Sequence, residues 1–491
     1  MLKMYIGGRW VSAVSGRTRS IINPATGEQI DVAAEGGAED ARLAIAAARK
    51  AFDESDWPHT SARHRARLLF RLADLIERHA GELARMETEN NGKPLADAED
   101  DVLTAANVFR YYAGLIGKPS GQVSDLPGSY VGRVVREPIG VCGLIVPWNF
   151  PLMMASWKLA PCLAAGNTCV FKPAELTPVT AVRLFELMEE AGFPPGVANL
   201  LLGEGRTAGA ELAAHEQVDK IAFTGGTETG RGVMRAAAGN IKKLSLELGG
   251  KSANIVFADA DLDIAADYAV SGIFLNAGQV CSAGSRLLVE ESVYDRFVDM
   301  VVERARKIRV GNGLHPGVEM GPLISEAHMN KVLGYIKAGI EEGAVLLTGG
   351  KRITEGELAR GFFVEPTVFG DVHSGMRIFR EEIFGPVLSV TKFRDEEDAV
   401  RLANDSIYGL AGAVFTSDAG KAERVARRVR VGVFWINVYH PAMVEMPWGG
   451  YKQSGLGREL GTFGLDAFTE VKQIVHNLHP GPLGYYHWNR S

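Results

Sequence analysis

The feature that most limits the fold is an alternation of short apolar runs with helical segments, which continues from residue 139 almost to residue 437. Runs such as VCGLIVPW (141–148) and KIAFTG (220–225) have the composition of strands, whereas PLMMASWKLAPCLAAG (151–166) has helical periodicity. Strands that alternate with helices in this way predict parallel sheets with helices on both faces. Sheets of this kind bind ligands at the carboxyl ends of their strands.

The alternation restarts in the middle of the chain, and 491 residues are too many for one hydrophobic core. We therefore predict an α/β fold with two parallel-sheet domains, the first Rossmann-like. The first domain comprises residues 1–117 and 139–249, and the second comprises residues 250–453. Residues 118–138 and 465–491 are extended and fit neither core, so we expect them to form a small β element for oligomerisation.

Charge and composition exclude several classes of protein. The chain has 53 basic and 59 acidic residues and a formal net charge of −6, which gives no reason to expect nucleic acid or a membrane surface as a partner. Residues 138–157 carry no charge, but their prolines and glycines predict a buried strand, a turn and the start of a helix rather than a membrane span. No apolar run of a signal peptide is seen at the N-terminus.

The four cysteines form no C-x-x-C pair, so we expect no structural zinc and a reducing, cytoplasmic location. Cys142, Cys162 and Cys169 have apolar neighbours and are predicted to be buried. Cys281 lies among small residues in NAGQVCSAGS (276–285), where a ligand can reach it. Because little of a free thiol is ionised at neutral pH, a nucleophilic role would require a base or a lowered pKa. An inert small side chain is the alternative.

Two further motifs are predicted to contact a ligand. FTGGTETG (223–230) places Gly225, Gly226 and Gly230 where a strand gives way to a helix, whose N-terminal N–H groups favour an anion such as pyrophosphate. FKPAE (171–175) ends a strand with Lys172 and Glu175, and an acidic side chain there can accept the hydroxyls of a ribose. A plain tight turn and a solvated ion pair are the alternatives.

Two polar residues interrupt apolar stretches. Glu247 ends a strand in LELGGKS (246–252), and a carboxylate that emerges from a strand into a site is a candidate general base. Asn149 lies in PWNF (147–150), where its amide could donate to a developing oxyanion. A capping glutamate and a buried asparagine bonded to backbone are the alternatives.

Together with EEIFGPV (381–387) and PWGGYKQSG (447–455), these motifs follow the order and approximate spacing of the aldehyde dehydrogenase superfamily, which the chain resembles over essentially its whole length. The resemblance implies that Cys281 is the nucleophile, Glu247 the general base and Asn149 the oxyanion donor. It also implies that Lys158 and Glu459 relay protons.

The resemblance implies NAD as the cofactor, with NADP as the alternative, bound by the first domain. The residues that it assigns to the cofactor are Ile145, Trp148, Lys172, Glu175, Gly205, Phe223, Gly225, Gly226, Thr229, Leu248, Glu382 and Phe384. No metal is implied. The family usually has serine where this chain has Gly226, so the N–H is kept but a hydroxyl contact to phosphate is lost.

The implied reaction oxidises an aldehyde to a carboxylic acid through a thiohemiacetal and a thioester on the cysteine. Some stretches, such as NDSIYGLAGAVF (404–415), most resemble glycine betaine aldehyde dehydrogenases, which hold trimethylammonium in aromatic side chains. Phe150, Trp157, Tyr439 and Trp448 are at or near such positions. Leu275, Val438 and the segment 442–446 depart from that pattern.

Several alternatives stay open at this point. The substrate could be another aliphatic or aromatic aldehyde. A CoA-acylating dehydrogenase is disfavoured, because such enzymes usually lack a carboxylate at the position of Glu247. A non-catalytic binding protein would not need Cys281, Glu247 and Asn149 together. The resemblance also implies a homotetramer or a homodimer.

Overall fold

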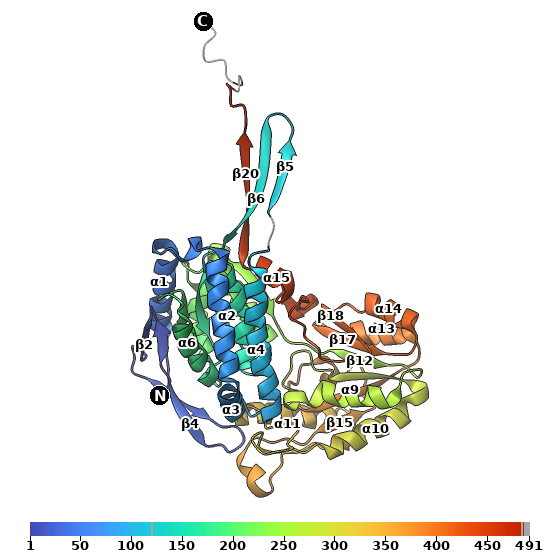
Figure 1. Ribbon diagram of the computed structural model, residues 1–491. Coiled ribbons are helices and arrows are strands. Elements are labelled where there is room, and N and C mark those ends of the chain that lie inside the picture. The colour runs from blue at the N-terminus through green and yellow to red at the C-terminus, as the bar shows by residue number, and fades with distance from the viewer. Residues whose placement is uncertain (119–120, 483–484, 486–491) are drawn as a thin grey trace.

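Two α/β units lie side by side, and a narrow β element projects from them (Figure 1). The computed structural model describes residues 1–118, 121–482 and 485. The predicted contact segments extend past these limits, so their residues 119–120, 483–484 and 486–491 lie outside the described part of the chain. The predicted fold class, two parallel-sheet α/β units plus a small β element, is confirmed.

The first sheet has the strand order β19-β11-β10-β7-β8-β9-β1-β2. Its strands are β1 (Met4–Ile6), β2 (Arg9–Val11), β7 (Val141–Ile145), β8 (Thr168–Lys172), β9 (Ala198–Leu200), β10 (Lys220–Thr224), β11 (Lys243–Glu247) and β19 (Gly455–Leu456). The five central strands are parallel, and the edge strands β1, β2 and β19 are antiparallel. Buried residues fill β7, β8 and β10 completely, as expected for a sheet covered on both faces.

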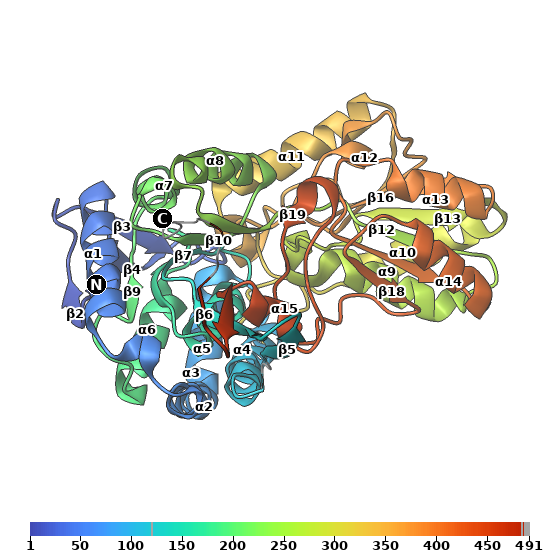
Figure 2. The ribbon, with the colours of Figure 1, turned by 90° about the horizontal axis from the view of Figure 1, so that it is seen from above.

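Helices cover both faces of this sheet (Figure 2). On one face α5 and α6 pack against the strands, and α2, α3 and α4 form a second layer on them; α1, α7 and α8 lie on the other face. These helices are α1 (Ala38–Glu54), α2 (Ala62–Arg78), α3 (Ala80–Asn91), α4 (Leu95–Leu115), α5 (Pro151–Ala164), α6 (Val179–Ala191), α7 (Ala210–Ala214) and α8 (Thr227–Ala237). The uncharged segment 138–157 thus forms a strand, a turn and a helix start, as predicted.

The second sheet has the order β14-β15-β16-β13-β12-β17-β18 and is parallel except for β14. Its strands are β12 (Ala253–Val256), β13 (Arg286–Glu290), β14 (Val345–Thr348), β15 (Thr367–Gly370), β16 (Val387–Phe393), β17 (Ala411–Phe415) and β18 (Val433–Ile436). Its helices are α9 (Leu262–Phe274), α10 (Tyr294–Lys307), α11 (Glu326–Glu341), α12 (Arg377–Arg380), α13 (Glu396–Asn404) and α14 (Ala419–Arg428).

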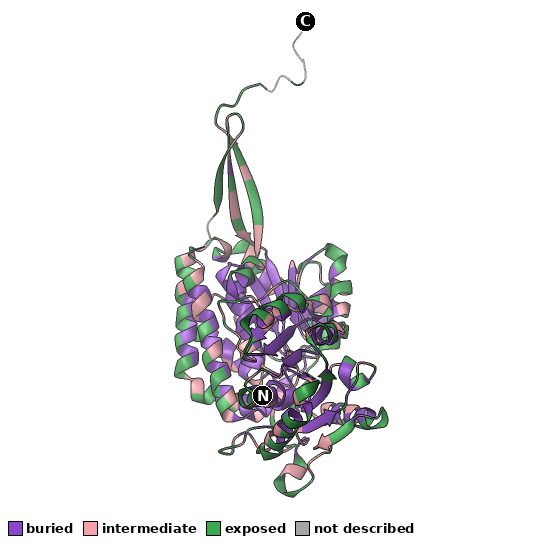
Figure 3. Ribbon diagram, turned by 90° about the vertical axis from the view of Figure 1, so that its right-hand side faces the viewer, coloured by how far each residue is buried: buried purple, intermediate pink, exposed green. Residues whose placement is uncertain are grey.

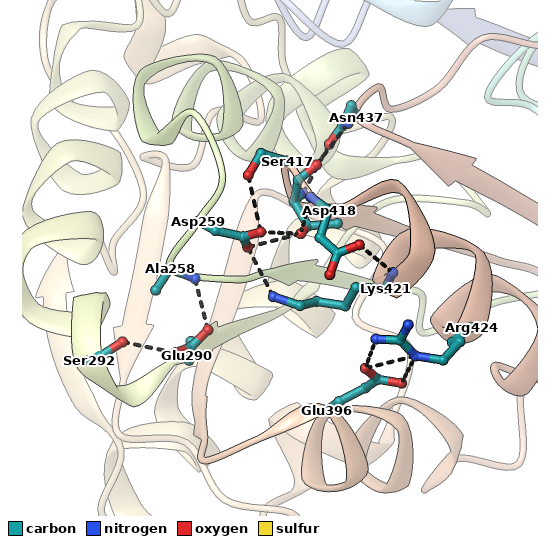
Figure 4. A network of polar contacts seen from close by, with 11 residues as sticks. Ala258, Asp259, Glu290, Ser292, Glu396, Ser417, Asp418, Lys421, Arg424 and Asn437 are labelled. Atoms are coloured by element: carbon teal, nitrogen blue, oxygen red, sulfur yellow. Dashed lines mark hydrogen bonds and ion pairs between the residues drawn. The ribbon is translucent and has the colours of Figure 1, made fainter.

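Hydrogen bonds close the carboxyl edge of this second sheet (Figure 4). The Asp259 carboxylate, just after β12, accepts from the hydroxyl of Thr416 at 2.8 Å and from that of Ser417 at 3.1 Å, and it pairs with Lys421 of α14 at 3.2 Å. Asn437, after β18, exchanges two hydrogen bonds with the backbone of Thr416. Side chains and helix α14 therefore occupy the place where a parallel sheet commonly binds its ligand.

The projecting element is an antiparallel sheet of order β20-β6-β5, formed by β5 (Gln122–Leu126), β6 (Tyr130–Pro138) and β20 (Thr469–Asn477). A short helix, α15 (Gly461–Asp466), precedes strand β20. Most of this sheet is exposed (Figure 3), including the apolar side chains of Val123, Val471 and Val475. The extended character predicted for segments 118–138 and 465–491 is confirmed for the residues of β5, β6 and β20, but it is wrong for residues 465–466, which end helix α15.

Three local features are not visible in the short motifs. Helix α9 ends at Phe274, and Asn276 and Ala277 just after it adopt left-handed backbone angles. Helix α6 begins after Pro178 without a side-chain cap. An antiparallel hairpin of β3 (Thr18–Ile22) and β4 (Gln29–Ala34) precedes α1.

Candidate active site

One cavity of about 1500 Å³ lies between the two sheets. Lys172, Phe223 and Glu247, at or beside the carboxyl ends of strands in the first sheet, line it, as do Cys281 and Glu382, which precede β13 and β16 in the second. The carboxyl edge of the first sheet therefore faces the amino edge of the second. Every residue that the resemblance assigns to the site lines this cavity except Lys158, and Gly230 of the glycine motif does not line it either. The lining residues are Ile145, Trp148, Asn149, Phe150, Trp157, Lys172, Glu175, Gly205, Phe223, Gly225, Gly226, Thr229, Glu247, Leu248, Cys281, Glu382, Phe384, Tyr439, Trp448 and Glu459.

Cys281 is the one cysteine that is not fully buried, whereas Cys142, Cys162 and Cys169 have no exposed surface. Burial, together with the nearby carboxylates of Glu382 and Glu247, raises the pKa of the Cys281 thiol to about 12, while backbone N–H groups at Cys281 and Ser282 act in the opposite direction. The thiol is therefore protonated at rest, and a nucleophilic role requires a base or a change in the nearby charge.

The left-handed turn before Cys281 is fixed by tertiary contacts. The Asn276 side-chain amide donates to the Asn149 carbonyl oxygen at 2.9 Å, and the Asn149 amide donates to the Gln279 carbonyl oxygen at 2.8 Å. These two bonds join the end of β7 to the loop that carries the cysteine. Because a primary amide has two N–H donors, Asn149 retains a second one in the cavity wall.

Glu247 is a buried carboxyl group, and neither of its oxygens has a hydrogen-bond partner among the described residues. Burial raises its pKa well above the ordinary value, and the neighbouring Glu459 raises it further, while Lys158 and Arg458 partly offset this. An orphaned buried carboxyl group is unusual and calls for a functional explanation. Once it is ionised, a carboxylate that lines a cavity can accept a proton from a bound water.

Lys158 and Glu459 form a buried ion pair, although they lie 301 residues apart in the chain. Lys158, on α5, is the predicted residue that lies behind the cavity wall, whereas Glu459 reaches the cavity. The second carboxylate oxygen of Glu459 has no partner among the described residues. The pair thus connects Lys158, behind the cavity wall, with Glu459 in the cavity, next to Glu247.

The part of the wall predicted to bind the cofactor, called the cofactor wall below, begins at strand ends. Ile145 pairs with Lys172 and Phe223 in neighbouring strands, so these side chains lie in register at one edge. Lys172 is buried, and its ammonium lies 3.7 Å from the Glu175 carboxylate. Burial lowers the pKa of Lys172.

The glycine turn before α8 has two different roles. The Gly225 N–H donates to the Glu247 carbonyl oxygen at 3.0 Å, so it joins β10 to β11. Gly226 is the N-cap of α8, and apart from its own chain neighbours no residue comes within 4 Å of the position where a side chain would begin. The helix end therefore offers open space for an anion at Gly226.

Four aromatic residues, called the aromatic wall below, line the cavity in unequal ways. Trp157 and Trp448 pack edge to face with centroids 5.6 Å apart. One face of Phe150 already carries the buried ammonium of Lys93, 4.3 Å from the ring centroid. The Tyr439 hydroxyl donates to the Ser282 carbonyl oxygen at 2.9 Å, beside the cysteine. Trp157 and Trp448 are thus the pair best placed to meet a ligand.

Comparison with known proteins agrees with this geometry. The sequence matches the aldehyde dehydrogenase family over residues 10–474. A betaine aldehyde dehydrogenase of Bacillus subtilis is 55% identical over 485 residues, which cover 98% of this chain and 99% of the relative. A mitochondrial aldehyde dehydrogenase of Homo sapiens is 50% identical over 477 residues, covering 96% of this chain and 91% of the relative.

A crystal structure of betaine aldehyde dehydrogenase from Staphylococcus aureus in complex with NAD+ superposes with a TM-score of 0.98 at 48% identity, covering 99% of this chain and 96% of that one. This chain belongs to the aldehyde dehydrogenase family. The resemblance seen in the sequence is confirmed, and the protein is an NAD(P)-dependent aldehyde dehydrogenase.

For this aldehyde dehydrogenase, the sequence motifs did not reveal several residues of the cavity. Asp100, Asp101 and Thr104 enter from α4, and His328 and Lys331 enter from α11. Residues 100 and 104 are one helical turn apart, which was the available signal. A polar residue at such spacing is equally typical of a solvent-exposed helix face, so the sequence alone does not distinguish the two.

Membrane-spanning helices and metal-binding clusters are both absent from the described residues. None of the helices there combines the length and the apolarity that crossing a bilayer would require. Within the same part of the chain, His, Cys, Asp and Glu side chains form no group of three that could hold a metal ion.

Proposed function

We propose that this enzyme uses NAD to oxidise an aldehyde that bears a quaternary ammonium group, of the betaine aldehyde type, to its carboxylic acid. The observation that carries the proposal is the convergence of Cys281, Glu247 and Asn149 on one cavity that also has an aromatic wall. Relatives named for betaine aldehyde support the choice of substrate.

The roles of the chain's residues follow from their chemistry. The Cys281 thiol first loses its proton to solvent, and the thiolate sulfur then adds to the carbonyl carbon. The electron pair of the C=O bond moves to oxygen, where the second N–H of Asn149 and the backbone N–H of Cys281 stabilise it. When bound, NAD accepts the hydride that leaves the former aldehyde carbon. The thioester left on Cys281 is then hydrolysed by a water that gives its proton to Glu247, and breaking the C–S bond releases the acid.

The cofactor wall supports NAD. The open N-terminus of α8 at Gly226 favours the pyrophosphate, and the Glu175 carboxylate beside Lys172 can accept ribose hydroxyls. Because Glu175 would repel a 2′-phosphate and Lys172 offsets part of that repulsion, we expect a moderate preference for NAD. Glu175→Gln should move the ratio of kcat/KM for NAD to that for NADP toward NADP by several fold; an unchanged ratio would contradict this role.

A cationic substrate is supported by charge as well as by rings. Asp100 and Asp101 line the cavity, but the charge of Asp101 is balanced by Lys93, whose ammonium lies over Phe150. Asp100 is therefore the acidic group that adds negative charge near the aromatic wall. A trimethylammonium group has no proton to donate, so it is held by ring faces and by longer-range attraction to carboxylates rather than by hydrogen bonds. Another hydrophobic aldehyde is the second candidate, favoured by the apolar lining near Leu275.

We also propose the predicted domain roles and assembly. Residues 1–117 and 139–249 would bind the cofactor and residues 250–453 would carry the nucleophile. Segments 118–138 and 465–491 would join subunits into a homodimer or homotetramer, which the exposed apolar residues of the projecting sheet support. A cytoplasmic location is supported by four cysteines that form no disulfide.

Two experiments test the proposed function. Cys281→Ala should abolish oxidation while NAD still binds; turnover above a small fraction of wild type would contradict the role of Cys281 as the nucleophile.

Betaine aldehyde and 3,3-dimethylbutanal have the same shape but differ in charge, so the proposal expects a clearly higher kcat/KM for betaine aldehyde. Equal or higher efficiency with the neutral aldehyde would leave a general hydrophobic aldehyde site, and acyl transfer to added CoA would indicate the acylating class.

A further inference from the structure

His328 occupies the first turn of α11 and lines the cavity. Its backbone N–H donates to the N-cap hydroxyl of Ser325 at 3.2 Å, which fixes the start of the helix. Its ring Nε2 lies 2.7 Å from the Phe384 carbonyl oxygen. Because a carbonyl oxygen can only accept, Nε2 carries the proton and donates. A side chain from α11 thus holds the backbone of a segment more than fifty residues away in the chain.

The backbone at Phe384 is in a strained conformation. Its φ angle is +61°, a left-handed value that bulky side chains rarely adopt and that persists only when the surroundings enforce it. The ring of Trp148 lies 5.2 Å from that of His328 and 5.3 Å from that of Phe384, both edge to face. The hydrogen bond from His328 and this ring packing are the restraints that hold the turn.

The same turn also touches the loop of the nucleophile. A Cβ atom added at Gly278 would lie 2.1 Å from the Gly385 carbonyl oxygen, and one added at Gly385 would lie 2.6 Å from Val332 of α11. The turn is therefore wedged between α11 and the loop that leads to Cys281. On its other side, Glu382 accepts a hydrogen bond from the Gly250 N–H at 3.0 Å.

We propose that His328 is a positioning residue, which fixes the turn Glu382–Gly385 and through it both the proposed ribose contact of Glu382 and the loop that carries Cys281. The proposal rests on the proposed use of NAD for its first part and on this chain's own packing for its second. Burial lowers the pKa of His328 to about 4, so the ring stays uncharged at neutral pH and its bond does not depend on pH there.

A pair of amide substitutions separates the hydrogen bond from the mere presence of a side chain. In His328→Gln the amide nitrogen reaches about as far as Nε2, whereas in His328→Asn it stops near the position of Nδ1. The matched control is His64→Asn, because His64 also follows a serine N-cap by three residues, in α2, but its side chain is exposed. The measurements are the Kd of NAD by fluorescence titration and, without cofactor, the rate at which iodoacetamide alkylates Cys281.

We expect His328→Asn to raise the Kd of NAD by about three- to tenfold, the range for one lost hydrogen bond, and to speed alkylation at least about twofold. His328→Gln should restore most of both, and His64→Asn should change neither. The proposal would be overturned if His328→Asn kept both the Kd of NAD and the alkylation rate within twofold of wild type. It would also be overturned if folded His328→Asn and His328→Gln proteins changed these two quantities equally. If wild-type protein bound no NAD, the proposed function would fail, and alkylation would still decide the role of His328.

Discussion

The two parallel sheets have similar architecture but use opposite edges. The first presents its carboxyl edge to the cavity, with Lys172, Phe223 and Glu247 at or beside strand ends. The second presents its amino edge, from loops that carry Cys281 and Glu382, while Asp259 and its partners close its carboxyl edge. A carboxyl edge is therefore only a potential site. The edge binds a ligand where helix ends and open space remain. Where side chains hydrogen-bond across the edge, it serves only to stabilise the fold.

The largest effect of this comparison is expected at the carboxyl edge of the first sheet, which faces the cavity. Glu247→Gln should slow hydrolysis of the thioester by about 10²- to 10⁴-fold while the first turnover persists, because a base is needed mainly in the second step. A burst of NADH followed by slow turnover is the signature to measure. Loss of the burst itself, with no acyl-enzyme to trap, would assign Glu247 a different role.

The pH dependence of this substitution has a definite sign. Since the pKa of Glu247 is raised, its carboxyl group loses its proton only as pH increases through that raised value, so wild-type hydrolysis should rise with pH there and the glutamine variant should not. The raised pKa also means that wild type loses stability as pH rises from the unfolded value near 4.5 to the folded one. At alkaline pH the variant should therefore be at least as stable as wild type.

At the carboxyl edge of the second sheet, a substitution should lower stability and leave activity nearly unchanged. Asp259→Ala removes the acceptor for Thr416, Ser417 and Lys421, and we expect it to lower the free energy of unfolding by about 1–3 kcal/mol while kcat/KM changes less than about twofold. Denaturant titration and steady-state kinetics measure the two quantities. Asp267→Ala, at an exposed position on α9, is the control. A large loss of activity without loss of stability would make this edge functional.

A smaller effect is expected at the aromatic wall, which belongs to neither sheet edge. Trp448→Ala leaves the two backbone hydrogen bonds to Glu459 in place and removes the ring that packs on Trp157. The KM for betaine aldehyde should rise by about 3- to 30-fold, more than that for 3,3-dimethylbutanal. Trp448→Phe should retain part of the difference. An equal rise in KM for both aldehydes would show that the aromatic wall acts only as a hydrophobic lining.

The smallest effect is expected at Gly226. Because no residue other than its chain neighbours comes within 4 Å of the position of its Cβ, and its φ of −67° suits any residue, Gly226→Ser should be accepted without strain. A serine hydroxyl beside the pyrophosphate should lower the Kd of NAD by about twofold. Gly239→Ser, also in open space, is the control for serine itself. Weaker NAD binding would show that the anion does not lie at this helix end.

The sequence predicted the first sheet's edge better than any other region. Strand, turn and helix follow one another locally there, so Lys172, Glu247 and the turn at Gly226 could be located from short motifs. The turn at Asn276 could not, because its left-handed angles depend on a hydrogen bond to Asn149, 127 residues away. His328 was missed for the same reason, since only the fold brings its ring to the Phe384 carbonyl.

The projecting sheet has a consequence for hydrogen–deuterium exchange. Strand β5 is short and exposed, and among the described residues it pairs only with β6, so its amides lie far from the protected core and should exchange within the fastest class of the chain. Amides of β7 and β10, buried at the centre of the first sheet, should exchange only on global unfolding. A subunit contact that covers Gln122–Leu126 would slow exchange of the β5 amides and leave that of β7 and β10 unchanged. The exchange rate of β5 therefore measures the fraction of the protein that is assembled into oligomers.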